Sequence, residues 1–371
     1  MKSEGWKIRL RRVLSYMGRV TKDKKRKSIP RIMAEFLAAS IRTKGVATHY
    51  FTSFLYRKDA GDYRDHLSQK EMRRPQVVLC EKNAIDILHN KLLCQLYFEK
   101  AGFRFPRLIA YNFQEVLYFA DDARNRLTDL ADPERMREAI RVVVAKSATG
   151  SIFIKPINSA CGVGARKISI GAEGLSGELL TELARSISSG SYVFQDEVIQ
   201  HGVLSSLNAS SLNTIRIDTF KNASSNPEML SGYLRIGGAG SYVDNVSAGG
   251  MYVGIDMETG TLKEKARRNL KSGADIYFSH PASGIVFKGL ALPYFADVKT
   301  LVLGAASLLP AAMIGWDVAI AADGPILMEG NAIFYGVQTH DIVHEGYRKN
   351  PVYQKVLSAY KNAKKTARKR M

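Results

Sequence analysis

Apolar and polar positions follow a helical spacing in the first part of the chain. From residue 32 to about residue 73 this spacing is weak, whereas the segment from Asn90 to Gly102 has clear helix start and stop signals. Asn90 can cap the start of that helix, and Gly102 lies where a helix ends. Another helix, rich in charged residues, is predicted for about residues 132–145. The chain therefore begins with a mostly helical region, residues 1–85, and further helices follow it.

Beyond residue 145, short apolar runs predict strands. A glycine-bearing loop follows the first of them, and a turn containing Asp323 joins the last two. The predicted strands are residues 151–156, 166–170, 192–197, 214–220, 232–236, 252–256, 314–320 and 326–328, and a helix is predicted at residues 177–188. Strand pairs mixed with helices indicate an α+β fold rather than a regular parallel repeat.

Charge is concentrated at the two ends of the chain, which has a net charge of +19. Residues 1–74 contain 20 Lys/Arg and 7 Asp/Glu, and residues 345–371 contain 9 and 1, so the middle is close to neutral. Basic ends around a neutral body indicate attachment to an anionic membrane surface or a phosphorylated carrier. Solvated tails that aid solubility explain the pattern equally well. Nucleic acid is disfavoured because no basic stretch carries regularly spaced aromatic residues.

The amino-acid composition indicates which class of protein this is. With 46% hydrophobic and 24% charged residues, the 371-residue chain has the balance of an ordinary soluble globular protein. Three cysteines without paired spacing argue against a disulfide framework or a zinc ribbon. No apolar run approaches a bilayer span, and the N-terminus does not have the pattern of a secretory signal. We expect a cytoplasmic protein, and peripheral attachment to the inner face of the membrane is an open alternative.

Two carboxylates and an amide lie on the last predicted strand pair. A hairpin centred near Asp323 would place Asp317 opposite Glu329, and Asn331 would project from the same face as Glu329 because strand side chains alternate. Oxygen ligands of this kind suit Mg²⁺, with waters and phosphate oxygens completing its octahedron. Taken alone, the pattern fits three polar residues at a solvated hairpin rim equally well.

A lysine and a glycine-bearing loop follow the first predicted strand. Lys155 ends the apolar run, and the loop at residues 158–165 contains Gly162 and Gly164. Such a lysine can place its ammonium on phosphate oxygens while loop N–H groups close over them. Neither a Walker loop nor a dinucleotide fingerprint is present. The alternative is a lysine that extends to water at a sheet edge before an ordinary turn.

Two arginines interrupt apolar strands. If Arg216 and Arg235 face inward, they need anionic partners such as phosphate or carboxylate, because arginine keeps its charge. Facing outward, they would carry no function. A second polar loop, residues 244–250, contains Asn245 and could close on a ligand.

Three other residues are weaker candidates for a functional site. His340 and His344 have the spacing of two metal ligands on a helix, but no third ligand is identifiable, so zinc is disfavoured. Cys161 lies in the glycine-bearing loop without a histidine nearby in sequence to activate it. We interpret this cysteine as a small filler of the loop.

Taken in chain order, these features resemble the ATP-grasp superfamily over roughly residues 85–350. Lys91, at a helix start, is similar to the family's first nucleotide lysine, and Lys155 is similar to its second. Residues 193–198 resemble the hinge whose backbone binds adenine and whose acid binds ribose. The nucleotide-binding residues implied by the resemblance are Lys91, Lys155, Gly162, Gly164, Gln195, Asp196, Glu197, Val198 and Asn245, and the implied magnesium ligands are Asp317, Glu329 and Asn331.

Residues 211–216, 245–250 and 314–317 resemble the branch called sugar-transfer-associated ATP-grasp proteins. The implied fold is α+β, with two α+β subdomains that sandwich ATP and a basic helical N-terminal extension. The usual N-terminal substrate domain of such ligases is α/β, so the resemblance does not identify a substrate. The expected parts are residues 1–85, a catalytic region at 86–350 with a smaller nucleotide lid at about 145–198, and a basic C-terminal helix or tail at 351–371.

The resemblance implies an ATP-dependent carboxylate–amine ligase that forms an acyl phosphate and releases ADP and phosphate. Its implied cofactors are ATP and Mg²⁺, and its substrates are a small-molecule carboxylate and an amine from polysaccharide or amino-acid-conjugate biosynthesis. The implied catalytic residues are Arg216, Lys155 and Arg235. Two alternatives stay open: a kinase that phosphorylates a hydroxyl, such as that of a sugar, and a non-catalytic nucleotide-binding scaffold.

Overall fold

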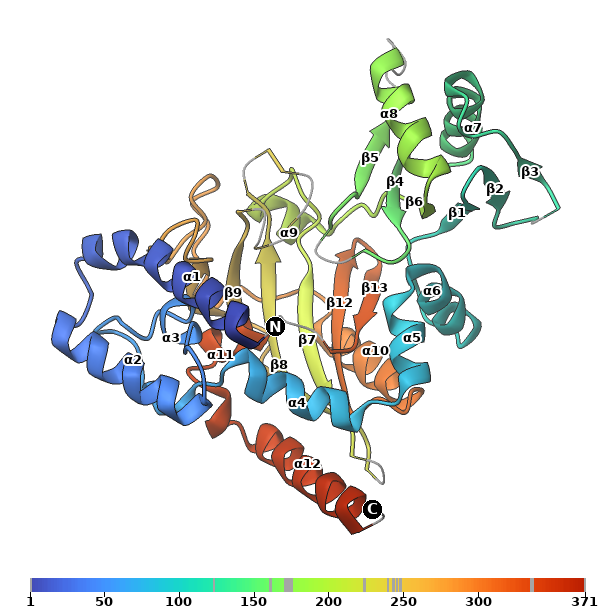
Figure 1. Ribbon diagram of the computed structural model, residues 1–371. Coiled ribbons are helices and arrows are strands. Elements are labelled where there is room, and N and C mark those ends of the chain that lie inside the picture. The colour runs from blue at the N-terminus through green and yellow to red at the C-terminus, as the bar shows by residue number, and fades with distance from the viewer. Residues whose placement is uncertain are drawn as a thin grey trace. The chain divides into compact units, whose positions relative to one another are not determined.

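The computed structural model divides the chain into two compact units (Figure 1). Unit 1 consists of residues 1–85, 202–318 and 331–371, and unit 2 consists of residues 86–201 and 319–330. The residues that the structure describes are 2–122, 124–159, 162–169, 176–222, 225–238, 240–241, 244, 246, 249–333 and 337–369. The predicted α+β class is confirmed, since helices accompany two antiparallel sheets. The predicted division into three sequence ranges stays a prediction.

Helices form the N-terminal part of unit 1, and the expected helical N-terminal region is confirmed. Tyr50, Phe51 and Phe54 are each at most 1% exposed and form the centre of its core. Burying an aromatic side chain of this size contributes about 1.5–3 kcal/mol. The elements are α1 (Lys2–Lys22), α2 (Ile29–Thr43), α3 (His49–Thr52), η1 (Tyr63–Asp65), α4 (Gln69–Leu79) and α5 (Lys82–His89).

A seven-stranded sheet follows, with the order β11-β10-β9-β8-β7-β12-β13. The strands are β7 (Ile215–Phe220), β8 (Glu228–Ile236), β9 (Met251–Ile255), β10 (Leu262–Arg268), β11 (Ile276–Tyr277), β12 (Met313–Ala321) and β13 (Gly324–Asn331). All residues of β7, β9 and β12 are buried, which fits the mostly apolar sequences of β9 and β12, whereas β7 also buries Arg216, Asp218 and Thr219. The remaining elements of this part of the chain are α9 (Gly202–Leu207), α10 (Phe295–Ser307), α11 (Val337–Val343), η3 (Tyr347–Lys349) and α12 (Pro351–Lys369).

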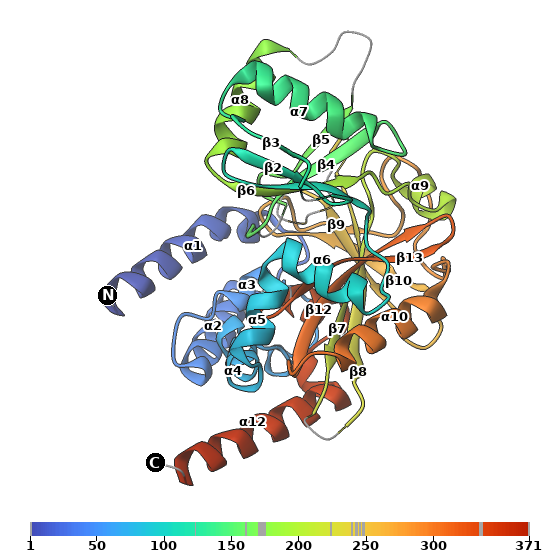
Figure 2. The ribbon, with the colours of Figure 1, turned by 90° about the vertical axis from the view of Figure 1, so that its right-hand side faces the viewer.

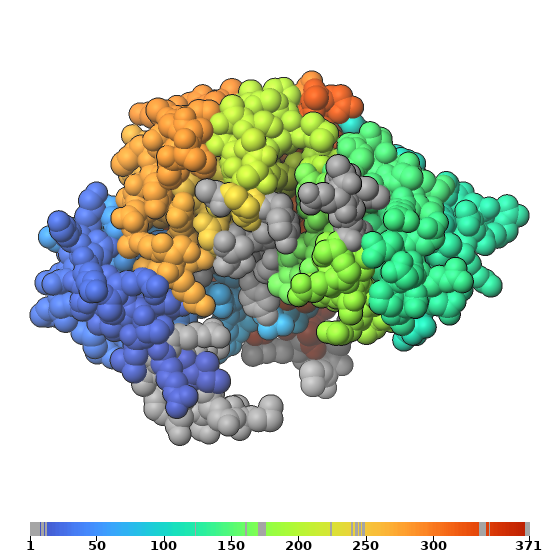
Figure 3. Space-filling view, turned by 90° about the horizontal axis from the view of Figure 1, so that it is seen from above, coloured from blue at the N-terminus to red at the C-terminus, as the bar shows by residue number. Residues whose placement is uncertain are grey.

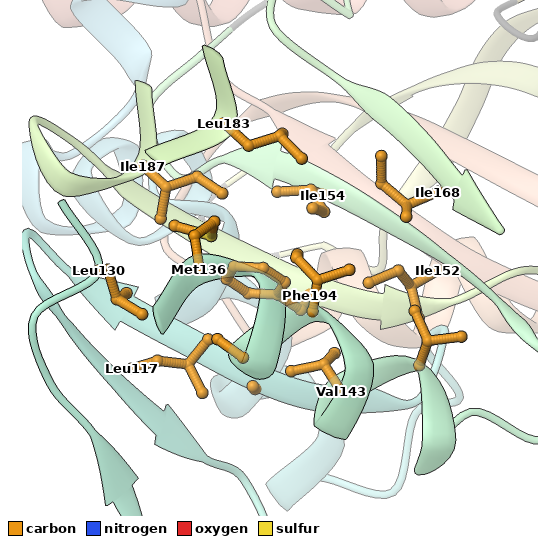
Figure 4. Packing of buried hydrophobic residues seen from close by; sticks show 14 of the residues in the cluster. Leu117, Leu130, Met136, Val143, Ile152, Ile154, Ile168, Leu183, Ile187 and Phe194 are labelled. Atoms are coloured by element: carbon orange, nitrogen blue, oxygen red, sulfur yellow. The ribbon is translucent and has the colours of Figure 1, made fainter. Parts of the chain in front are cut away.

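Unit 2 contains a six-stranded sheet with the order β3-β2-β1-β6-β4-β5 (Figure 2). Its strands are β1 (Leu108–Phe113), β2 (Val116–Phe119), β3 (Arg126–Leu127), β4 (Ser151–Pro156), β5 (Arg166–Ser169) and β6 (Ser191–Asp196), and its helices are α6 (Lys91–Lys100), α7 (Pro133–Ala145) and α8 (Gly177–Ser188). Helices α7 and α8 cover one face of this sheet. Ile152, Ile154 and Phe194 of the strands pack there against Val143 of α7 and Leu183 of α8 (Figure 4).

Three helices of unit 2 lie where the sequence predicted them, and a side chain caps the first turn of each. Asn90 caps α6, since its Oδ1 accepts a hydrogen bond from the N–H of Leu93 at 2.9 Å. Gly102 follows the helix with φ of +86°, a conformation that glycine adopts without strain. Asp132 caps α7 in the same way through the N–H groups of Glu134 and Arg135. The predicted helices at 90–102, 132–145 and 177–188 are thus confirmed.

Candidate functional site

The predicted site residues fall into two groups, one in each compact unit. In unit 2, β4 and β6 present alternating side chains to the two faces of the sheet. Ile154 and Phe194 enter the core beneath α7 and α8, so Lys155 and Gln195, one position further along each strand, lie on the opposite face. The functional side chains of this unit therefore lie on the face opposite α7 and α8, where Leu92 and Gln95 of α6 contact the sheet.

A chain of polar contacts fixes Lys155 and Gln195. Nζ of Lys155 donates to Oε1 of Gln195 at 2.9 Å, and Nε2 of Gln195 donates to Oε1 of Gln95 at 2.6 Å. Nε2 of Gln95 donates in turn to Glu99 at 2.8 Å and to the Pro106 carbonyl at 2.8 Å. Because the ammonium only donates, the direction of both amides follows from it. Gln95 is fully buried and was missed in the sequence, where it resembles an ordinary helix residue.

Lys91 is the first residue of α6, and its ammonium contacts two other predicted features. Nζ of Lys91 donates a hydrogen bond to the carbonyl of Ser159, which belongs to the glycine-bearing loop. It also lies 3.3 Å from Oε2 of Glu329 on β13. The backbone N–H of Lys91 donates to the carbonyl of Ile157 at 3.0 Å and thereby ties the helix to the same loop. Lysine, loop and carboxylate are thus adjacent.

The glycines of this loop are required by its backbone. Gly162 and Gly164 have φ of +70° and +76°, which lie in the left-handed region. A Cβ added at Gly164 would lie 2.8 Å from Cγ of Pro156. The loop therefore holds its shape only with glycine there. Cys161, interpreted above as a filler, lies outside the described residues.

The predicted hinge residues at the end of β6 and directly after it have different surroundings. The Asp196 carboxylate accepts from the N–H of Ala148 at 3.1 Å and lies 3.3 Å from the Arg107 guanidinium, so it anchors the strand end. The Glu197 carboxylate pairs with Nζ of Lys167 at 2.5 Å. Val198 is half-buried directly after these two acids.

In unit 1, Asp317 lies beside both predicted arginines. The strand register places Asp317 of β12 opposite Arg216 of β7. Nε of Arg216 donates to Oδ1 of Asp317, and a terminal nitrogen donates to Oδ2 at 3.0 Å. A terminal nitrogen of Arg235, on β8, also lies 3.0 Å from Oδ2 of Asp317. Burial is the largest single effect and lowers the pKa of Arg216, but the charges of Asp317 and Tyr233 and the hydrogen bond to Asp317 together outweigh it, so the net effect raises that pKa. Of the two arrangements left open by the sequence, the structure has the inward-facing one, with Asp317 as the shared anionic partner.

A second carboxylate completes this group. Oδ2 of Asp244 lies 3.3 Å from Nε of Arg235 and accepts from the backbone N–H of Thr214 at 2.9 Å. Asp244 is 6% exposed. It was predicted only as part of a polar loop, because its partners are some 10 and 30 residues away in sequence. Asn245, the next residue and a predicted nucleotide contact, lies outside the described residues.

Asn331 ends β13. Its Nδ2 donates to the carbonyl of Gly315 at 3.4 Å, which directs the NH₂ side of the amide to β12. Among the residues that the structure describes, no group of three or more His, Cys, Asp or Glu side chains could hold a metal ion. That finding does not bear on the predicted magnesium set, which has two carboxylates and an amide.

The two histidines considered for zinc have other partners. His340 lies 2.6 Å from the hydroxyl of Ser231 and 3.0 Å from Oδ1 of Asp218, and all three side chains are fully buried. For His344, burial and the nearby Lys263 ammonium lower the pKa to about 3. Both histidines therefore belong to buried polar networks of unit 1 rather than to an open metal site.

The chain was compared with known proteins. No curated protein matches it. Two solved structures that it resembles are the ATP-grasp ligase PsnB complexed with minimal precursor (15% identity, TM-score 0.39, covering 76% of this chain and 63% of that chain) and D-alanine–D-alanine ligase from Bacillus anthracis (11% identity, TM-score 0.40, covering 76% and 69%). The chain thus spans less than two thirds of PsnB.

The family comparison is decisive. A model described as sugar-transfer associated ATP-grasp matches residues 77–352, which is well over half of the chain. The matched range begins in α4 and ends at the start of α12, so it includes both groups of candidate site residues. The chain belongs to the sugar-transfer-associated ATP-grasp family.

Proposed function

We propose that this chain is an ATP-dependent ligase that activates a carboxylate as an acyl phosphate and joins it to an amine. Family membership supports an ATP-dependent ligase in general. One observation carries the finer proposal: the Lys91 ammonium contacts both the Ser159 carbonyl and, at 3.3 Å, the Glu329 carboxylate. The ammonium of the predicted nucleotide-binding lysine thus contacts both the predicted phosphate loop and a predicted magnesium ligand. Building blocks of polysaccharides or amino-acid conjugates are the proposed substrates.

The two lysines of unit 2 hold the phosphates of ATP. Lysine ammonium groups form charge-assisted hydrogen bonds to phosphate oxygens, which are stronger than neutral ones. Gln195 holds the Lys155 ammonium at 2.9 Å on the face of the sheet opposite α7 and α8, so its position is set before ATP arrives. Gly162 and Gly164 let the loop backbone approach the phosphates closely. Val198, Asp196 and Glu197 form the hinge beside adenine and ribose.

Asp317, Glu329 and Asn331 would hold Mg²⁺. The donor set fits this ion, because Mg²⁺ takes carboxylate and amide oxygens and shares its remaining positions with water and phosphate. Both carboxylates already lie beside protein cations, Glu329 beside Lys91 and Asp317 beside two arginines. When ATP binds, its phosphate groups would become new partners of these cations. When bound, Mg²⁺ would neutralise charge on the phosphate oxygens.

The proposed reaction has two displacements. An oxygen of the substrate carboxylate attacks the γ-phosphorus, the bond from that phosphorus to the β–γ bridging oxygen breaks, and ADP leaves. Arg216 and Arg235 stabilise the charge on the transferring phosphoryl group. The amine nitrogen then attacks the acyl carbon, loses a proton to solvent, and phosphate leaves with the former carboxylate oxygen. The products are an amide, ADP and phosphate.

The test incubates the protein with Mg²⁺-ATP, pooled amino acids and uronic acids, and hydroxylamine, which traps acyl phosphates as hydroxamates. Phosphorus NMR and hydroxamate detection follow the products. The proposal expects ADP, phosphate and hydroxamate only when a carboxylate is present. ADP with a new phosphate ester would instead support a kinase, and ATP binding without turnover of any pooled substrate would support a scaffold.

Replacing Gly164 with alanine is expected to weaken ATP binding by about tenfold, or about 1.4 kcal/mol. The new methyl group would lie 2.8 Å from Pro156 in a backbone with φ of +76°, so the loop must shift. Calorimetric titration with Mg²⁺-ATP measures the affinity. Gly177→Ala is the control, because no atom lies within 4 Å of its added Cβ. Equal ATP affinities for the two variants would show that this loop does not bind the nucleotide.

A further inference from the structure

Helix α2 has an apolar face on each side. Its inner face contributes Ile32 and Ala39, both fully buried, to the N-terminal core. On its outer face Met33, Leu37 and Ile41 recur every four residues and are 43%, 54% and 77% exposed. Pro30, Ala34 and Ala38 are exposed on the same side. In Figure 1, α2 is drawn at the margin of unit 1. We call these six residues the α2 outer stripe.

Positive charge surrounds the α2 outer stripe. Residues 1–45 contain 14 Lys/Arg and 3 Asp/Glu. Two of the three acids are used inside the unit: Asp23 pairs with Arg57 at 2.8 Å, and Glu35 pairs with Lys27 at 2.7 Å. These carboxylates are 8% and 13% exposed, so they do little to offset charge at the surface. The exposed cations of this segment include Arg11, Arg19, Lys22, Lys24, Lys25, Arg31 and Lys44.

The cations lie at both ends of the stripe. Lys24 and Lys25 precede α2, and Lys44 follows Ile41 by three positions and caps the helix end. The N-terminal segment, coloured blue, is at the surface of unit 1 in Figure 3. An apolar face bordered by lysine and arginine is typical of helices that lie in a lipid interface.

The positive charge around the stripe distinguishes between two binding partners, a second copy of the chain and a membrane. A second copy of the chain would bring one basic segment against another, which costs energy through repulsion. An anionic bilayer has an apolar interior that buries Met33, Leu37 and Ile41. Its negative headgroups attract the cations around them. No helix among the described residues is long and apolar enough to cross a bilayer, so the attachment would be peripheral. We propose that the α2 outer stripe and its bordering cations dock this protein on an anionic membrane surface.

The test is co-sedimentation of the full-length protein with lipid vesicles. We expect binding to phosphatidylcholine vesicles that contain about 30 mol% phosphatidylglycerol and little binding to pure phosphatidylcholine. Binding should weaken when salt rises from about 0.1 M to about 1 M, since the Debye length falls from about 10 Å to about 3 Å. The double variant Leu37→Glu/Ile41→Glu should lower the fraction bound by about tenfold or more, because it places charge at the apolar contact.

The matched control is Phe278→Glu/Val286→Glu. These side chains are 51% and 61% exposed in unit 1, so the control has the same charge change at similarly exposed apolar positions. Circular dichroism confirms that both variants fold. Equal losses in both variants, equal binding to both vesicle types, or no vesicle binding would overturn the proposal. A dimer seen by light scattering that only the α2 variant dissociates, without vesicle binding, would assign the stripe to a second copy instead.

Discussion

Replacing Glu329 with glutamine is expected to abolish ATP-dependent turnover, with a loss of more than about 100-fold. The substitution keeps the size of the side chain and removes the charge that a magnesium ligand needs. Stability should change less than on removing a fully buried charge, because Glu329 and Lys91 remain 23% and 18% exposed. Turnover is measured as ADP release with the identified substrate pair, and the unfolding midpoint is measured in parallel.

A matched control lies in the turn of the same hairpin. Asp323→Asn also removes one carboxylate charge, but the Asp323 side chain is 73% exposed and pairs with Arg104 at 2.9 Å, away from the proposed ligands. This variant should turn over ATP like the unmodified protein. A Glu329→Gln protein with unchanged activity would contradict the assignment of Glu329 to the metal.

Replacing Asp317 with asparagine is expected to lower the free energy of unfolding by about 3–5 kcal/mol and to abolish turnover. The Asp317 and Arg216 side chains are 4% and 9% exposed, and Arg235 shares the same carboxylate. Removing the carboxylate charge leaves two guanidinium groups without their shared anion in a region of low dielectric. Urea denaturation measures the change in unfolding free energy.

Asp323→Asn again provides the comparison, with an expected cost of about 0–1 kcal/mol for an exposed ion pair. A difference of less than about 1 kcal/mol between Asp317→Asn and Asp323→Asn would show that the arginine–carboxylate group does not hold unit 1 together. Loss of turnover with full stability would still be compatible with metal binding by Asp317. The two measurements therefore separate a structural role from a catalytic one.

Features set by local chemistry were predicted well from the sequence. The cap at Asn90 depends on a residue three positions away, and the structure confirms it. By contrast, α10 was not predicted, because its apolar run contains few polar residues and a glycine and fits a helix or a buried strand equally well. Strand β10 was not predicted either, since the exposed Glu264 and Lys265 stand between its buried positions Leu262 and Ala266.

Contacts between distant strands could not be predicted in detail. The sequence indicated that Arg216 and Arg235 need anions and that Asp317 is a candidate ligand, but it could not show that they contact each other. That contact depends on the register between β7 and β12, whose paired residues are about 100 positions apart. For the same reason, the hydrogen bond between Gln95 and Gln195 could not be predicted, because these residues are also about 100 positions apart.

The central claim, activation of a carboxylate by its direct attack on ATP, is tested most directly with oxygen labels. A substrate identified by hydroxamate trapping is prepared with ¹⁸O in both carboxylate oxygens and incubated with Mg²⁺-ATP and the amine. Mass spectrometry of the released phosphate then reports its oxygen source. The account predicts one ¹⁸O atom in each phosphate, because the carboxylate oxygen leaves with the phosphoryl group. Unlabelled phosphate, or a stable phosphate ester in place of free phosphate, would contradict it.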